Sequence, residues 1–183
     1  MQGTLQNREN PVVIVYLAHG ASGNADSMRP HVDGLRTRGI EARAVGLPVG
    51  KAERAVSRYA EQVDDLGHQV IGGHSYGGRV ASLLAAESVP AGLVLLSYPL
   101  HRPGHPEWET RIPHWPSITC PVLLLSGESD PFAQVDLLRR AVERLPNAEL
   151  TTYARIGHGL TPVLDDALGQ VARFVASLSA GAG

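Results

Sequence analysis

The sequence contains a single cysteine, Cys120, so no disulfide can form within the chain. It also lacks an excess of charge of either sign, with 16 basic and 18 acidic side chains and a formal net charge of −2. This composition provides no basic face for counterion-driven binding, so nucleic acid is not expected as a partner. The longest apolar runs, Val12 to Leu17 and Val122 to Leu125, are far shorter than the ~20 residues that a membrane helix requires. We therefore expect a soluble protein without a membrane partner.

The amino-terminal residues MQGTLQNRENP lack the basic stretch and apolar core of a secretory signal. A chain with one cysteine suits a reducing compartment. We therefore expect a cytoplasmic protein, while noting that the mature form of a secreted protein would look the same at this end.

Short apolar runs, rich in Val, Ile and Leu and bounded by Gly or Pro, predict buried strands. They are Val12 to Ala18, Ala42 to Leu47, Gln69 to Gly73, Leu93 to Ser97 and Val122 to Ser126, with Glu149 to Ala154 as a weaker sixth candidate. Because these runs are continuous rather than alternating, we expect helices on both faces of the sheet. Helical spacing is found in Ser27 to Arg38, Lys51 to Leu66, Tyr76 to Ser88, Gln134 to Arg144 and Thr161 to Leu178. This alternation predicts an α/β fold with an open, mostly parallel sheet of about six strands.

Residues 1–183 are expected to form one domain, because a chain of this length can bury roughly 70% of its unfolded surface in one core. The stretch from Tyr98 to Pro116 breaks the alternation with five prolines, which forbid a continuous helix. We interpret it as a structured excursion after the fourth strand. Ser179 to Gly183 is expected to be a flexible tail.

The strongest motif is Gly73-His74-Ser75-Tyr76-Gly77, which matches G-x-S-x-G between a predicted strand and a predicted helix. A nucleophilic serine on a sharp strand-to-helix turn needs small residues two positions before and two after it. Gly73 and Gly77 provide this space. The sequence therefore predicts Ser75 as a nucleophile, with a glycine-rich helix start capped by Ser75 as the alternative.

Two further residues complete the chain order Ser, Asp, His that is typical of hydrolases of this kind. Asp130 follows the strand candidate Val122 to Ser126, and His158 follows the last strand candidate. Ligands of open parallel sheets bind at the carboxyl ends of the strands, so the three side chains should converge. His158 would take the proton of Ser75, and Asp130 would fix the tautomer of His158.

Other acids compete with Asp130 for this role. Glu128 is the serious rival, because it lies two residues nearer to the strand. Asp165 and Asp166 are more consistent with the first turns of the last helix, where acidic side chains suit the helix dipole.

Acyl transfer also requires backbone donors for the oxyanion. One should be the amide of Tyr76, and the other should come from the loop after the first strand, His19-Gly20-Ala21-Ser22-Gly23. We predict the amide of Ala21, with Ser22 as the neighbouring alternative.

These motifs together resemble the α/β-hydrolase superfamily, specifically its small, lidless, dienelactone-hydrolase-like members of the group typified by testis-expressed protein thirty. The resemblance covers nearly the whole chain and rests on H-G-A-S-G with Met28-Arg29-Pro30, G-G-H-S-Y-G-G-R, L-S-Y-P-L-H-R-P-G-H-P-E and S-G-E-S-D-P-F. It implies Ser75 as nucleophile, Asp130 as acid and His158 as base. It also implies a shallow site without a cap domain, which argues against a dedicated long-chain lipase, and it gives no substrate.

Four residues are predicted to bind substrate because they follow strands at the same edge of the sheet: Ser22, Tyr98, Leu100 and His101. Trp108 and Trp115 are expected to pack the proline-rich stretch onto the body rather than cover the pocket. Arg79 is expected to pair with an acid, with contact to an anionic substrate as the alternative.

The three histidines of the proline-rich stretch, His101, His105 and His114, have acidic residues nearby, but their spacing fits no standard ligand pattern. We therefore expect no metal and no cofactor. Cys120 is expected to be a small core residue.

The sequence thus predicts a serine hydrolase that cleaves a small ester or thioester through an acyl-enzyme, acting as a monomer or homodimer on a small acyl substrate. An acyl transferase, lyase or cyclase on the same fold is the first alternative, since fold does not determine function. A non-catalytic interaction module is the second.

Overall fold

The computed structural model describes residues 12–180 and contains one six-stranded sheet. The strands are β1 Val15–Ala18, β2 Ala42–Val45, β3 Val70–His74, β4 Gly92–Leu96, β5 Val122–Gly127 and β6 Ala148–Tyr153. Their order across the sheet is β2-β1-β3-β4-β5-β6, and every neighbouring pair is parallel. The predicted fold class is confirmed, and β1 begins three residues later than expected.

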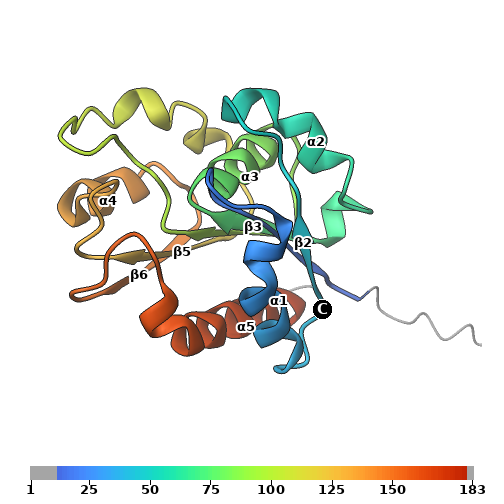
Figure 1. The fold of residues 1–183 in the computed structure, drawn as a ribbon. Coiled ribbons are helices and arrows are strands. Elements are labelled where there is room, and N and C mark those ends of the chain that lie inside the picture. Colours follow the sequence, from blue (N-terminus) through green and yellow to red (C-terminus); the bar gives the residue numbers. More distant parts are fainter. Residues whose placement is uncertain (1–11, 181–183) are drawn as a thin grey trace, which may run out of the picture.

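Helices cover both faces of the sheet (Figure 1). They are α1 Arg29–Arg36, α2 Val56–Ala60, α3 Tyr76–Glu87, α4 Val135–Val142 and α5 Leu164–Ala180. Buried residues of α1 and α5 join one apolar cluster, while those of α2, α3 and α4 join the other. Short 3-10 helices are η1 Ala25–Met28, η2 Ala52–Arg54, η3 Leu66–His68, η4 Glu109–Arg111, η5 Trp115–Ser117 and η6 Thr161–Val163. None of the helices within residues 12–180 combines the length and apolar character needed to cross a bilayer.

The predicted long helix from Lys51 to Leu66 is wrong, because this segment is divided into η2, α2 and η3. α2 is short because the chain turns after Ala60 to meet the loop that follows β2. There, the side-chain amide of Gln62 donates to the carbonyl of Gly46 and accepts from its N–H. The phenol of Tyr59, which is fully buried, anchors α2 to the backbone of Tyr16 in β1 and Gly72 in β3.

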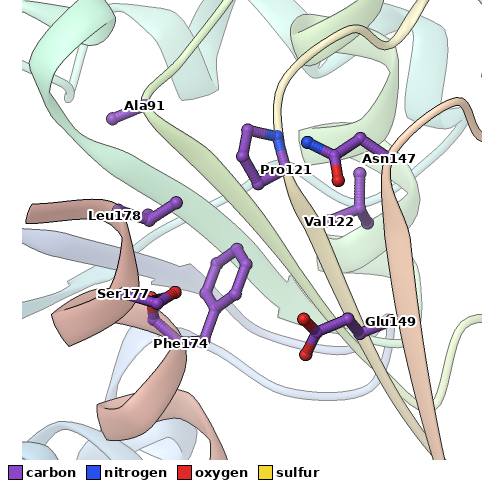
Figure 2. A pocket seen from close by; sticks show the side chains of 8 residues that line it. All are labelled: Ala91, Pro121, Val122, Asn147, Glu149, Phe174, Ser177 and Leu178. Atoms are coloured by element: carbon purple, nitrogen blue, oxygen red, sulfur yellow. Dashed lines mark hydrogen bonds between the residues drawn. The ribbon is translucent and has the colours of Figure 1, made fainter. Parts of the chain in front are cut away.

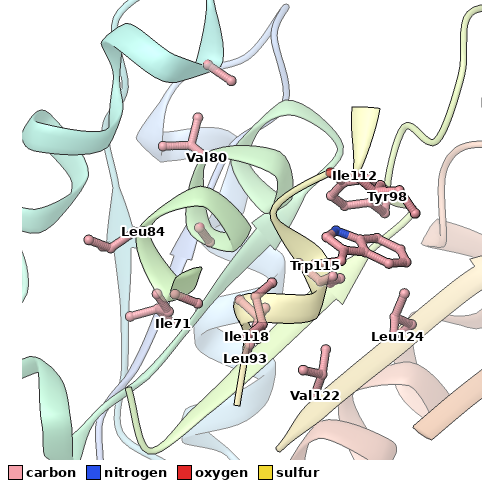
Figure 3. Close-up of a cluster of buried hydrophobic side chains, with 14 of the residues drawn as sticks. Ile71, Val80, Leu84, Leu93, Tyr98, Ile112, Trp115, Ile118, Val122 and Leu124 are labelled. Atoms are coloured by element: carbon pink, nitrogen blue, oxygen red, sulfur yellow. The ribbon is translucent and has the colours of Figure 1, made fainter. Parts of the chain in front are cut away.

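The proline-rich stretch packs onto the body as expected. Trp115 is fully buried, and its ring lies 5.0 Å from that of Tyr98 in an edge arrangement (Figure 3). Cys120 is also buried near the start of β5. At the carboxyl end of the chain, Ser179 and Ala180 are helical, so these two residues of the predicted flexible tail belong to α5. The rest of that tail and the amino-terminal segment 1–11 lie outside the described residues.

Candidate active site

Ser75 occupies the sharp turn between β3 and α3. Its backbone angles are φ 50° and ψ −115°, a conformation that residues other than glycine rarely adopt. The glycines on either side are required by close backbone packing: a Cβ on Gly73 would lie 2.5 Å from the carbonyl oxygen of Ala18, and one on Gly77 would clash with the same atom. The strain and the close packing together present Ser75 at the carboxyl edge of the sheet.

Three side chains from the ends of β3, β5 and β6 form a hydrogen-bonded chain. The Oγ of Ser75 lies 2.8 Å from Nε2 of His158, and Nδ1 of His158 lies 2.8 Å from Oδ2 of Asp130. The side chain of Asp130 is fully buried, whereas that of His158 keeps 24% of its surface exposed. A buried carboxylate that accepts from Nδ1 selects the tautomer in which Nε2 can accept the serine proton.

The turn that carries Asp130 is fixed by its own carboxylate. Oδ1 of Asp130 accepts a 2.8 Å hydrogen bond from the backbone N–H of Phe132, which leaves Oδ2 directed at His158. Glu128 instead accepts from the hydroxyl of Thr152 at 2.7 Å and lies near Arg139. In this geometry Glu128 is engaged elsewhere.

The two remaining acidic candidates belong to the first turn of α5, as predicted. Asp165 pairs with Arg38, and Asp166 accepts a hydrogen bond from the hydroxyl of Tyr153. Neither carboxylate faces His158 in this arrangement.

A cavity of about 670 Å³ opens beside Ser75. Its lining includes Ser75 and His158, and also Ala21 and Ser22 from the loop after β1. That loop is held by His19, whose Nδ1 donates to the carbonyl of Gly20 and whose Nε2 accepts from the N–H of Leu47. Tyr76 begins α3, where the first backbone N–H groups have no partner within the helix. The structure thus brings both predicted oxyanion residues next to the nucleophile.

Comparison with known proteins identifies the family. A family model described as an alpha/beta hydrolase domain matches residues 41–170, which is more than half of the chain. The chain belongs to the alpha/beta hydrolase domain family. The finer grouping with dienelactone-hydrolase-like proteins and testis-expressed protein thirty is not singled out by this match and stays a prediction.

Solved structures of similar fold include members named as lipases and esterases. A monoacylglycerol lipase from Paleococcus ferrophilus is 17% identical, with a TM-score of 0.77 over 90% of this chain and 94% of that one. An esterase from Pyrococcus furiosus is 19% identical, with a TM-score of 0.75 over 92% and 82%. Est1E from Butyrivibrio proteoclasticus, solved with bound ferulic acid, is 16% identical, with a TM-score of 0.70 over 92% of each chain. At these identities the likeness establishes the fold alone.

Three predicted substrate-binding residues of this hydrolase-domain protein do not line the cavity. Tyr98, Leu100 and His101 are each no more than 1% exposed, and all three face the interior. The chain turns at Ser97, where φ is 49°, and this sends the following residues into the core against Trp115. Of the four predicted positions, Ser22 is the one that reaches the cavity.

The buried His101 connects two loops of the hydrolase domain. Its Nδ1 donates to the carbonyl of Arg102, and its Nε2 accepts from the N–H of Gln134. Both ring nitrogens are therefore occupied by backbone groups. His114 likewise contacts the hydroxyl of Ser82 at 2.9 Å, and residues 12–180 hold no group of three or more side chains suited to a metal ion.

Three residues that line the cavity were not assigned to the site from the sequence. They are His31 on α1, His74 at the end of β3 and Phe132 after Asp130. The rings of His74 and Phe132 lie 5.2 Å and 4.5 Å from that of His158. Burial lowers the pKa of His74, and burial followed by the charge of His74 lowers the pKa of His31 to about 4. Both shifts favour the neutral form of the imidazole.

A separate cavity of about 420 Å³ lies at the other edge of the sheet (Figure 2). Its lining includes Pro121 just before β5, Asn147 just before β6, and Phe174 and Leu178 on α5. These positions are at the amino ends of the strands, whereas Ser75 lies at the carboxyl ends. This cavity is therefore remote from the hydrogen-bonded chain of Ser75, His158 and Asp130.

Proposed function

We propose that the protein is a serine hydrolase that cleaves a small carboxylic ester or thioester through an acyl-enzyme on Ser75. The observation that carries the proposal is the pair of 2.8 Å hydrogen bonds that joins Ser75, His158 and Asp130. This arrangement makes a serine hydroxyl nucleophilic at neutral pH, because the imidazole can accept its proton while the carboxylate stabilises the resulting imidazolium.

In the first half of the reaction, Oγ of Ser75 attacks the acyl carbon while its proton passes to Nε2 of His158. The charge that develops on the carbonyl oxygen is stabilised by the backbone N–H groups of Ala21 and Tyr76. Collapse of the tetrahedral intermediate expels the alcohol or thiol, which takes the proton from His158. The acyl group then remains esterified to Ser75.

In the second half, a water molecule replaces the leaving group beside His158. Nε2 accepts a proton from this water, whose oxygen attacks the acyl carbon, and the same N–H groups stabilise the second intermediate. Its collapse breaks the bond to Ser75, returns the proton to Oγ and releases the carboxylic acid. The cycle uses side chains and backbone groups of this chain and consumes one water.

We expect small esters rather than long acyl chains as substrates, because the proline-rich stretch does not cover the cavity. None of the residues of the proline-rich stretch between β4 and β5 lines the cavity beside Ser75, so this stretch does not act as a cap. The lining combines small residues such as Gly20, Ala21 and Gly159 with apolar side chains such as Met28 and Leu160. The lipase and esterase names of proteins with the same fold are consistent with ester substrates.

A fluorophosphonate probe tests the proposal directly. The purified protein should gain one adduct by intact mass spectrometry, and the Ser75→Ala and His158→Ala variants should gain none. A Ser177→Ala variant serves as a matched control, because Ser177 is an exposed serine on α5 and should leave labelling unchanged. If folded wild-type protein, verified by circular dichroism, gave no adduct, the hydrolase proposal would fail and a non-catalytic interaction module would replace it.

An ester panel then separates hydrolysis from the acyl-transfer and rearrangement alternatives. Reaction in ¹⁸O-labelled water should place one labelled oxygen in the carboxylic acid product. Product formation without label would show that the same nucleophile serves acyl transfer, a lyase step or a cyclisation instead.

A further inference from the structure

A second cavity at the carboxyl edge of the sheet lies between η2 and the start of α3, and its lining includes the residue that follows the nucleophile. It has a volume of about 690 Å³, and its walls come from residues 50–54 after β2, from the first turn of α3 and from the proline-rich stretch. Tyr76, the residue that follows Ser75, is part of its lining, and the hydroxyl of Tyr76 donates to the carbonyl of Pro48. Ser75 lines the first cavity and Tyr76 lines the second, so consecutive residues of the chain face the two cavities.

The lining of this second cavity is strongly basic, although the whole chain carries a net charge of −2. It contains five basic side chains and one carboxylate. These are Lys51, Arg54, Arg79, Arg102 and Arg111, together with Glu53.

The carboxylate of Glu53 forms an ion pair with Arg79. Nη2 of Arg79 donates to Oε1 of Glu53 at 2.8 Å, and Nη1 of Arg79 donates to the backbone carbonyl of Arg111 at 2.6 Å. This pairing confirms the expected partner type for Arg79. Since the side chain of Arg79 is only 15% exposed, it is held in place and contributes a fixed charge to the wall.

The other cations of the cavity are not neutralised in this way. Within residues 12–180, no carboxylate lies within 4.0 Å of the charged groups of Lys51, Arg102 or Arg111. Glu107 lines a smaller adjoining hollow with Arg102 and Arg111 but forms no ion pair with either. The cavity therefore presents several unpaired positive charges to a ligand.

Arg111 is the most informative of these residues. It is half-buried, and burial lowers its pKa first, followed by the charges of Arg79 and Arg102. A guanidinium remains protonated despite such a shift, so the repulsion is not relieved by loss of a proton. An anion between Arg102 and Arg111 would relieve it.

We propose that this cavity binds a phosphate group carried by a small molecule. Guanidinium groups present pairs of N–H donors that match the oxygens of phosphate, and several converging cations favour an anion with more than one charge. The hydroxyl of Thr110 in the same lining supplies a further donor. Because Tyr76, the residue after Ser75, lines this cavity, we assign the phosphate to the acyl substrate, which it anchors at a distance from the scissile bond; this assignment rests on the proposed hydrolase function.

The binding step is tested independently of catalysis with the Ser75→Ala protein. Isothermal titration with pyrophosphate at low ionic strength should give one site, and adding Arg111→Gln or Arg102→Gln should weaken it roughly tenfold, the loss expected for one charge-assisted hydrogen bond. Arg102 is exposed, so its replacement keeps the test valid if Arg111→Gln fails to fold. Arg140→Gln, which removes an exposed arginine on α4, is the matched control and should bind as before. Absence of binding, or equal binding by all variants, would overturn the proposal.

The source of the phosphate is tested with two esters that share one acyl group. One carries a phosphate on the alcohol and the other a hydroxyl in its place. The phosphorylated ester should have the higher kcat/KM with wild-type protein, Arg111→Gln should remove this preference, and the control Arg140→Gln should keep it. Pyrophosphate binding without such a preference would assign the site to a free phosphate compound and overturn the anchoring role. Failure of the hydrolase proposal would instead appear as no turnover of either ester with pyrophosphate binding intact.

Discussion

Nε2 of His74 lies 3.1 Å from the backbone carbonyl oxygen of His158 and donates a hydrogen bond to it. The residue before the nucleophile thereby holds the loop that carries the proposed base, and the two rings are 5.2 Å apart. His74 contacts the cavity without reaching the reacting atoms, so we assign it a positioning role.

Replacement of His74 by Phe should lower kcat about five- to tenfold, the equivalent of one ordinary hydrogen bond, because the carbonyl of His158 loses its donor. His74→Gln should recover much of the loss, since its side-chain amide can donate. Steady-state kinetics on an ester of the panel provides the measurement, with the exposed His68→Phe as control. Equal rates for the Phe and Gln variants would argue against the role of this hydrogen bond.

The acid of the site can be tested by a matched pair of substitutions. Asp130→Asn should reduce kcat about 10⁴-fold, because an amide no longer selects the productive tautomer of His158. Its Oδ1 can still accept from the N–H of Phe132, so the turn should survive. Glu128→Gln should leave kcat within about twofold, since Glu128 contacts Thr152 and Arg139 instead. The opposite ranking of the two variants would reassign the acid.

The sequence was sufficient to predict the order of the strands along the chain and the convergence of Ser75, Asp130 and His158, whose catalytic roles stay a prediction. These inferences succeed because buried parallel strands have a distinct composition, and because the chemistry requires particular residue types after particular strands. The assignments of Tyr98, Leu100 and His101 failed because a position after a strand predicts the edge of the sheet and not the direction of a side chain. That direction depends on the turn at Ser97, which no local pattern indicated.

Residues that reach the cavity from outside the motifs were equally hard to predict. His31 belongs to no motif, and the packing of α1 beside the turn at Ser75 brings it to the cavity and near His74. The basic cavity combines residues from three segments that are each unremarkable in sequence. Sites that are assembled by tertiary packing can thus be recognised only in the three-dimensional structure. Sites that lie at the ends of strands can be predicted from the sequence.

The close approach of Gly77 to the end of β1 predicts a large effect of one added methyl group. Gly77→Ala should lower the free energy of unfolding by about 1 to 3 kcal/mol, because its Cβ would overlap the carbonyl groups of Ala18 and His19. Urea denaturation followed by circular dichroism measures this change. Gly67→Ala is the control, since a Cβ there meets nothing within 4 Å, and it should change stability by less than about 0.5 kcal/mol.

The half-buried imidazole of His31 predicts a loss of stability in acid. Its pKa is lowered to about 4 in the folded protein, against about 6.5 when unfolded, so the unfolded chain binds more protons between these values. Stability contributed by neutral His31 is therefore present above about pH 6.5 and is lost as the pH falls toward 4, by about 2.5 kcal/mol near pH 4.5. His31→Leu removes this titration, and because Nδ1 of His31 has no hydrogen-bond partner among the described residues, the variant should be at least as stable as the wild type at pH 7. Urea denaturation of both proteins at pH 7 and pH 4.5 tests the difference: parallel losses would mean that His31 titrates normally in the folded state.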